Sequence, residues 1–129
     1  MPTAAECMSR ELLTIEPAAT LAEAARGMGE RGVGAVLVVA GEQLAGILTE
    51  RDILKAVGGG HETSERVSEW MTQHPDTVEP TDSTEHAAVL MVHGGYRHLP
   101  VVEGDTLVGI LSIRDLMRVS LEDRMPRGV

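Results

Sequence analysis

Apolar residues follow two different spacings along the first half of the chain, and each spacing predicts one kind of element. Residues 21, 24, 25 and 28 are apolar at the i, i+3, i+4, i+7 spacing of a helix face. Apolar runs at Val36–Val39 and Leu44–Leu48 are typical of two buried strands joined by a tight turn. A short extended piece, Thr14-Ile15, precedes the helix, and a last short helix is expected to start near Thr49. The pattern predicts the order β-α-β-β-α.

The same pattern recurs with an offset of 63 residues. Residues 8–57 align on residues 71–120 without a gap, and about a third of the aligned positions are identical, which indicates a duplication. The second copy has an extended piece at Thr77-Val78, strands at Leu99–Val102 and Leu107–Leu111, and a helix start near Ser112. Roughly 50 residues per copy are marginal for an independent core, so the halves should pack on each other. We predict an α/β (α+β) fold of two repeats related by pseudo-twofold symmetry.

The boundaries of the repeats follow from this alignment. We place repeat 1 at residues 7–57, a linker at 58–66 and repeat 2 at 67–121. The linker, GGGHETSER, contains three glycines but lacks the Gly-Lys-[Ser/Thr] of a phosphate-binding Walker A loop. We therefore expect a flexible connector.

Composition narrows the class of protein further. A net charge of −9 argues against nucleic-acid binding, which needs clustered Lys and Arg, and two aromatic residues offer no stacking surface. No apolar stretch has the length of a membrane span or a secretory signal. The single cysteine, Cys7, forms no intramolecular disulfide, so we expect a cytoplasmic location. The five histidines lack metal-ligand spacing, and no catalytic residues or cofactor-binding motif can be recognised.

Each repeat ends its second strand in [Ser/Thr]-x-Arg-Asp, written TERD at 49–52 and SIRD at 112–115. One interpretation is structural, since a hydroxyl residue followed three positions later by a carboxylate forms a helix capping box. The other is functional. A carboxylate complements the two hydroxyl donors of a ribose diol, and a helix N-terminus beside an Arg suits a phosphate. The motif alone leaves both open.

These motifs resemble the cystathionine-β-synthase (CBS) domain. The resemblance rests on Gly-h-[Leu/Ile]-[Ser/Thr]-x-x-Asp closing each repeat, on EWMT opening the second repeat and on GYRHLPVV within it, and it covers residues 7–121. Tandem CBS pairs, called Bateman modules, are sensors of adenosine-containing ligands: AMP, ADP, ATP, S-adenosylmethionine and sometimes NAD. They commonly form flat homodimers through the repeat helices.

The resemblance implies two ligand-binding clefts, each drawing on both repeats. Carried over to this sequence, the first cleft comprises Thr49, Arg51, Asp52, Thr77, Val78, Tyr96, Arg97, His98 and Pro100. The second comprises Thr14, Ile15, Val33, Gly34, Ala35, Ser112, Arg114 and Asp115. The clefts are unequal, because GYRHLP supplies Arg97 and His98 to the first, whereas GVGAVL supplies no such groups to the second.

The sequence thus favours a stand-alone regulatory module that binds an adenine nucleotide as regulatory ligand, forms a homodimer and signals to a protein partner. It predicts no enzyme activity, no metal site, no nucleic-acid binding and no membrane insertion. The alternative is a dimerising or protein-docking scaffold whose clefts stay empty. A third interpretation, a small enzyme, has no catalytic constellation to support it.

Overall fold

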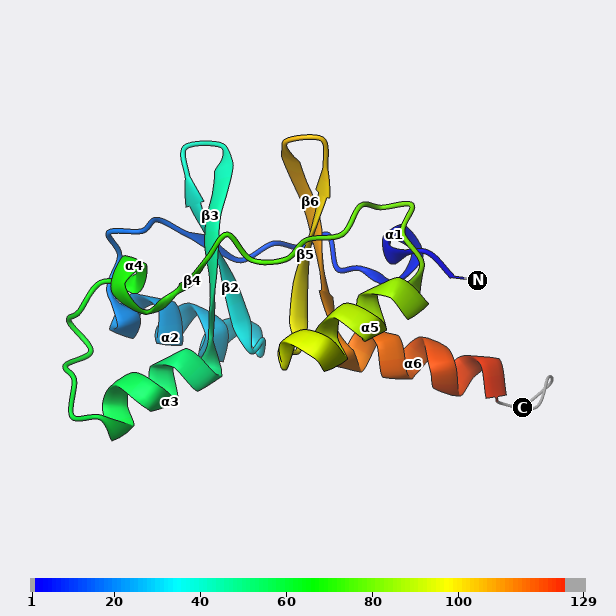
Figure 1. The fold of residues 1–129 in the computed structure, drawn as a ribbon. Coiled ribbons are helices and arrows are strands. Elements are labelled where there is room, and N and C mark those ends of the chain that lie inside the picture. The colour runs from blue at the N-terminus through cyan, green and yellow to red at the C-terminus, as the bar shows by residue number, and fades with distance from the viewer. Residues whose placement is uncertain (1, 125–129) are drawn as a thin grey trace. The chain divides into compact units, whose positions relative to one another are not determined.

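A computed structural model describes residues 2–124 of the 129-residue chain. The chain forms two compact units (Figure 1). The first-repeat unit is Leu12–Pro75, and the second-repeat unit combines Met1–Glu11 with Asp76–Val129. Each unit therefore contains most of one sequence repeat and a short segment of the other repeat.

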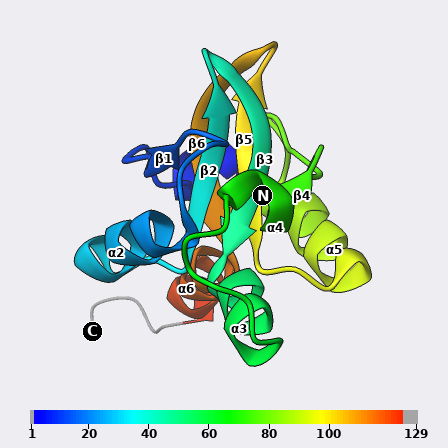
Figure 2. The same ribbon diagram turned by 90° about the vertical axis from the view of Figure 1, so that its left-hand side faces the viewer.

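The first-repeat unit is built on a four-stranded sheet in the order β1-β2-β3-β4, in which β1 is parallel to β2 and the other pairs are antiparallel. The strands are β1 (Thr14–Ile15), β2 (Ala35–Ala40), β3 (Gln43–Thr49) and β4 (Thr72–Gln73). The helices are α2 (Leu21–Arg31), α3 (Glu50–Gly58) and α4 (Val67–Trp70). Figures 1 and 2 show α2 and α3 near the end of the β2–β3 hairpin that lies away from its turn. The predicted order β-α-β-β-α is confirmed.

Helix α2 begins and ends at residues suited to those positions. The Thr20 hydroxyl accepts the N–H of Glu23 at 3.1 Å, as an N-cap does. The helix ends at Gly32, whose φ of 64° lies in the left-handed region that glycine adopts without strain. Leu21 and Met28 are buried as predicted, whereas Ala25, expected on the same face, is exposed.

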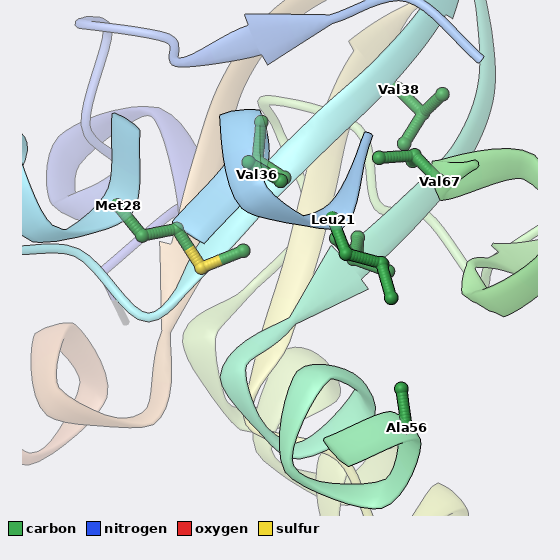
Figure 3. Close-up of a cluster of buried hydrophobic side chains, with 8 residues drawn as sticks. Leu21, Met28, Val36, Val38, Ala56 and Val67 are labelled. Carbon is green, nitrogen blue, oxygen red and sulfur yellow. The ribbon is translucent and has the colours of Figure 1, made fainter. Parts of the chain in front are cut away.

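The core of this unit is formed by side chains from α2, the β2–β3 hairpin, α3 and the short helix α4 (Figure 3). The labelled side chains come from α2 (Leu21, Met28), β2 (Val36, Val38), α3 (Ala56) and α4 (Val67). All six are at most 5% exposed, so the unit buries its apolar stripe without any aromatic residue at its centre.

The second-repeat unit repeats this arrangement with a two-stranded sheet. It contains α1 (Ala4–Cys7), α5 (Thr84–Gly94), β5 (His98–Glu103), β6 (Thr106–Ser112) and α6 (Ile113–Arg124). Strands β5 and β6 are antiparallel. Val78 forms a parallel bridge with Val101, and Ser9 an antiparallel bridge with Ile110. These bridges occupy the places of β1 and β4, so Thr77-Val78, predicted as an extended piece, contributes a bridge to the sheet.

Residues 2–9 adjoin and overlap the start of the first repeat in sequence but belong to the second-repeat unit. The N–H of Ala4 donates to the carbonyl of Asp82 at 2.7 Å, and the N–H of Ala5 to that of Pro80 at 3.0 Å. Ala4 has no exposed surface. The N-terminal segment is therefore an integral part of this unit.

Residues 65–72 make the equivalent contacts in the first-repeat unit, at the same offset of 63 residues from residues 2–9. The N–H of Val67 donates to the carbonyl of Ala19 at 2.8 Å, and Val67 is completely buried. The repeat therefore begins near residue 2, and its two opening segments (residues 2–9 and 65–72) are exchanged: each packs in the unit formed mainly by the other repeat.

The linker at 58–66 differs from the flexible connector that its glycines predict. The N–H of His61 donates to the carbonyl of Ala56 at 2.9 Å, and the carbonyl of Glu65 accepts the N–H of Leu21 at 3.0 Å. The Glu65 carboxylate lies 2.9 Å from His61 Nδ1 and accepts the indole N–H of Trp70 at 3.0 Å. The His61 and Trp70 rings meet edge to face at 4.7 Å. These contacts fix the path of the linker.

This cluster predicts a pH dependence of stability. Hydrogen bonds from Trp70 and His61 lower the pKa of Glu65, so the folded state favours the carboxylate. The stabilisation is present above the unfolded pKa of 4.5 and is lost as the pH falls through the lower, folded value. We expect Glu65→Gln, which keeps an acceptor for Trp70, to reduce modestly the stability lost between about pH 6 and about pH 3. Urea unfolding followed by fluorescence of Trp70, the single tryptophan, measures this. A variant with unchanged pH dependence would contradict it.

Candidate functional site

The first [Ser/Thr]-x-Arg-Asp motif forms a complete capping box at the start of α3. Asp52 Oδ2 accepts the N–H of Thr49 at 2.9 Å and lies 3.2 Å from the Thr49 hydroxyl, which accepts the N–H of Asp52 at 3.3 Å. Both side chains are part-buried. The structural interpretation of the motif is therefore confirmed. Both contacts made by the Asp52 carboxylate use Oδ2, so its second oxygen, Oδ1, lies outside the capping box.

The second motif is built in the same way at the start of α6, with one difference. Asp115 Oδ2 accepts the N–H of Ser112 at 2.8 Å, and the Ser112 hydroxyl accepts the N–H of Asp115 at 3.1 Å. Asp115 Oδ1 lies 3.5 Å from Arg118 Nη1. The second oxygen, which the first motif keeps outside the box, is here paired with an arginine.

Within the first-repeat unit, the first motif (residues 49–52) adjoins residues that the sequence analysis assigned to the second cleft. Ala35 pairs with Thr49 across the hairpin, and the carbonyl of Gly34 accepts the N–H of Glu50 at 3.0 Å. The segment that precedes β2 and the helix N-terminus therefore lie side by side.

In the second-repeat unit, the equivalent segments are the residues at the start of β5 and the second motif (residues 112–115). Here the residues next to the motif are polar. His98 pairs with Ser112 across the hairpin, and the carbonyl of Arg97 accepts the N–H of Ile113 at 2.8 Å. The Arg97 side chain is exposed and that of His98 is half-buried. Arg114 is also exposed, so two arginines, Arg97 and Arg114, lie on segments next to the N-terminus of α6.

The remaining predicted site residues differ in accessibility. Thr14 and Thr77 are exposed and Ile15 is half-buried, while Val33 is 44% exposed. Val78 and Pro100 are fully buried, and the N–H of Val78 donates to the carbonyl of Pro100 at 3.1 Å. In this conformation the side chains of these two residues pack in the core, so any contact with a ligand has to come from neighbouring residues.

Tyr96 has a partner that the sequence did not indicate. Its hydroxyl donates to Asp76 Oδ2 at 2.6 Å. Burial first, and then this hydrogen bond and the negative charge of Asp76, raise the pKa of Tyr96 well above its ordinary value. Asp76 immediately precedes Thr77, so the bond joins two of the segments assigned to the first cleft.

Sequence reasoning missed Asp76 and Arg118 for different reasons. Asp76 lies twenty residues from Tyr96, and no periodic pattern connects them. Arg118 could have been noticed, because it lies three residues after Asp115, at the spacing of helical ion pairs.

The other reactive groups lack the features of a reaction centre. Burial, followed by the charges of Glu6, Asp115 and Glu122, raises the pKa of the Cys7 thiol, which disfavours a nucleophilic thiolate. Among residues 2–124, no group of three His, Cys, Asp or Glu side chains is arranged to hold a metal ion. Within the same part of the chain, every helix is too short or too polar to cross a lipid bilayer.

Comparison with known families identifies the repeats. The CBS-domain family matches this chain twice, at residues 4–59 and 67–122. The chain belongs to the CBS-domain family and carries a tandem pair of these domains. The first match begins at residue 4, which agrees with the place of the N-terminal segment in the repeat.

Similar proteins support the same conclusion. The chain is 37% identical over 117 residues to the CBS domain-containing protein YhcV of Bacillus subtilis, covering 90% of this chain and 84% of that protein. A CBS-domain-containing protein from Agrobacterium tumefaciens has a similar structure, with a TM-score of 0.83 and 33% identity, covering 87% of this chain and 91% of that one. The protein CBSX2, solved in complex with AMP, shares the fold at a TM-score of 0.83 and 24% identity, covering 97% of this chain and all of that one.

Proposed function

We propose that the chain is a regulatory module that binds an adenosine-containing ligand, AMP, ADP or ATP in the first place and S-adenosylmethionine or NAD as alternatives. The observation that carries the proposal is the pair of capping-box aspartates at the starts of α3 and α6. In each box Oδ2 holds the helix start. Asp52 Oδ1 is left outside its box and can accept a hydrogen bond from a ribose hydroxyl. The same carboxylate can then serve both roles.

The surroundings of these carboxylates suit the phosphate of a nucleotide. A helix N-terminus carries partial positive charge, and Arg51 and Arg114 directly precede the two aspartates. Both arginines are exposed and available to a ligand. The assignment of residues from both repeats to each cleft rests on the family resemblance.

The two proposed clefts should differ in strength. Asp52 keeps Oδ1 outside its capping box, whereas Asp115 Oδ1 is paired with Arg118. The first cleft also includes Arg97 and His98, where the second has Gly34 and Ala35. We therefore assign the tighter, phosphate-preferring site to the first cleft.

Thermal unfolding with AMP, ATP, NAD and S-adenosylmethionine tests the proposal. A ligand that binds only the folded state raises the midpoint in proportion to the logarithm of its concentration. We expect at least one of the four to do so. A midpoint unmoved by all four at millimolar concentration would favour the ligand-free scaffold instead.

Arg97 should determine the preference for phosphorylated ligands. Its guanidinium stays charged at every working pH and can bind two phosphate oxygens at once. We expect wild type to bind AMP more tightly than adenosine, and Arg97→Ala to weaken AMP by about 1.5–3 kcal/mol while changing adenosine little. Calorimetry with both ligands measures the difference. Equal losses for AMP and adenosine would remove the phosphate role of Arg97.

Exposed apolar residues on the helices support self-association as part of the function. Leu54 on α3 is 71% exposed, Val92 on α5 is 77% exposed, and Leu121 on α6 is 61% exposed. Val57, Val89 and Met117 extend these faces. Twofold homodimers are the commonest form of soluble homo-oligomer.

We accordingly expect a homodimer at tens of micromolar. Leu54→Glu and Val92→Glu place a charge on two of these faces, and at least one of them should shift the equilibrium toward monomer. Lys55→Glu, which changes charge on α3 outside the apolar faces, is the control. Sedimentation that gives a single monomeric species for wild type would contradict the prediction.

A further inference from the structure

The bond between Tyr96 and Asp76 ties together two short segments of the second-repeat unit. Tyr96 lies between α5 and β5, immediately before Arg97. Asp76 immediately precedes Thr77. At 2.6 Å, with an ionised acceptor, the bond has the length of a strong charge-assisted hydrogen bond.

Two further contacts restrict the Tyr96 ring. The side chain packs against the apolar core of the unit, and the ring lies directly over Gly94, where a Cβ atom would collide with it. The N–H of Tyr96 donates to the carbonyl of Met91 at 3.2 Å. Packing thus fixes the apolar part of the residue, and Asp76 fixes its polar end.

The first repeat has no such pair. At the offset of 63 residues, Leu13 stands in the place of Asp76 and Val33 in that of Tyr96. The Leu13 side chain lies near Gly27, and Val33 is 44% exposed. The polar pair is therefore a property of one repeat, the one that also carries Arg97 and His98.

We propose that Asp76 is a positioning residue of the first cleft, which holds the Tyr96 ring and the segment before Thr77 in the geometry that receives an adenosine ligand. This inference rests on the proposed function. A tyrosine held in place before binding loses little side-chain freedom when the ligand arrives, so pre-organisation raises affinity. Because the Tyr96 hydroxyl donates to Asp76, we expect Tyr96 to contact the ligand through the face of its ring and not through its hydroxyl.

The contact itself can be tested without any ligand. Tyr96 is the single tyrosine of the chain, so ultraviolet absorbance of tyrosinate reports on this residue alone. Asp76→Asn removes the negative charge and keeps an acceptor. We expect ionisation of Tyr96 to begin at lower pH in this variant than in wild type. Identical titrations, in variants shown to be folded by circular dichroism, would overturn the contact.

The positioning role is tested by a double-mutant cycle with AMP as the probe, measured by calorimetry. If Asp76 acts through the Tyr96 hydroxyl, Asp76→Ala and Tyr96→Phe should each weaken binding by about three- to tenfold, and the double variant no more than either alone. Asp76→Asn should recover much of the loss. Asp105→Ala, which removes an exposed charge at the β5–β6 turn, is the control and should bind as wild type does.

The outcomes separate the inference from the proposed function. Two results would overturn the positioning role and leave the proposed function standing. One is a double variant whose loss of affinity is the product of the two single losses; the other is an Asp76→Ala variant that binds AMP within about twofold of wild type. Wild type that binds none of the four adenosyl ligands overturns the proposed function and the positioning role together. In that case the tyrosine titration still decides whether Asp76 holds Tyr96.

Discussion

Replacing Asp52 by alanine should weaken binding of the adenosine ligand by about 1.5–3 kcal/mol, the range for a hydrogen bond to a charged group. The same change removes the acceptor for the Thr49 N–H at 2.9 Å and should lower the free energy of unfolding by about 0.5–2 kcal/mol. Calorimetry with AMP and urea denaturation measure the two effects separately.

Asp52→Asn distinguishes the two roles of this carboxylate. The amide oxygen can still accept the Thr49 N–H, so we expect most of the capping stability to remain. The charge is lost, so affinity for the ribose hydroxyls should still fall. Asp115→Ala is the matched control, and since Asp115 Oδ1 is paired with Arg118, its effect on binding should be smaller. An Asp52→Asn variant with full affinity would mean that the motif only caps the helix.

Gly46→Ala should destabilise the first-repeat unit by about 1–3 kcal/mol, as overpacking of a filled site does. A Cβ atom at this position would lie 2.6 Å from the carbonyl oxygen of Thr72 and 2.8 Å from the sulfur of Met71. The thioether can move, but the Thr72 carbonyl is held by the pairing of β4 with β3. The substitution therefore has to displace β4.

Gly29→Ala provides the matched control for this prediction. Gly29 lies in α2, and a Cβ atom added there would meet nothing within 4 Å, so alanine should stabilise the helix by about 0.5–1 kcal/mol. Circular dichroism follows global unfolding, while fluorescence of Trp70, on the adjacent α4, follows detachment of the segment. Equal free energies of unfolding for Gly46→Ala and wild type would show that β4 can shift without loss of stability.

The secondary structure could be predicted because the same pattern occurs twice. The apolar spacing within the first copy predicts β2, β3 and α2, and the same spacing 63 residues later supports each of them. The exchange of opening segments could not be predicted. Helices α1 and α4 span four residues each, too short for an apolar periodicity, and main-chain hydrogen bonds such as that from Ala4 to Asp82 select their position.

The candidate site was predictable only in part. The motifs at 49–52 and 112–115 are local, so their capping geometry follows from the sequence alone. The buried state of Val78 and the bond between Tyr96 and Asp76 depend on how distant segments pack, and a residue's type says little about either. The polar pair also has no counterpart in the first repeat, so the internal alignment offered no second copy of the signal.

The exchange of opening segments bears on how such a chain arose. A single ancestral repeat of this kind would leave the outer edge of its own hairpin unpaired, since its opening segment pairs in the other unit. Two separate copies could pair both edges by exchanging their opening segments. Fusion of their genes would then keep this exchange within one polypeptide. The gene for one repeat, expressed alone, should accordingly give a reciprocally swapped dimer that resembles the state before duplication.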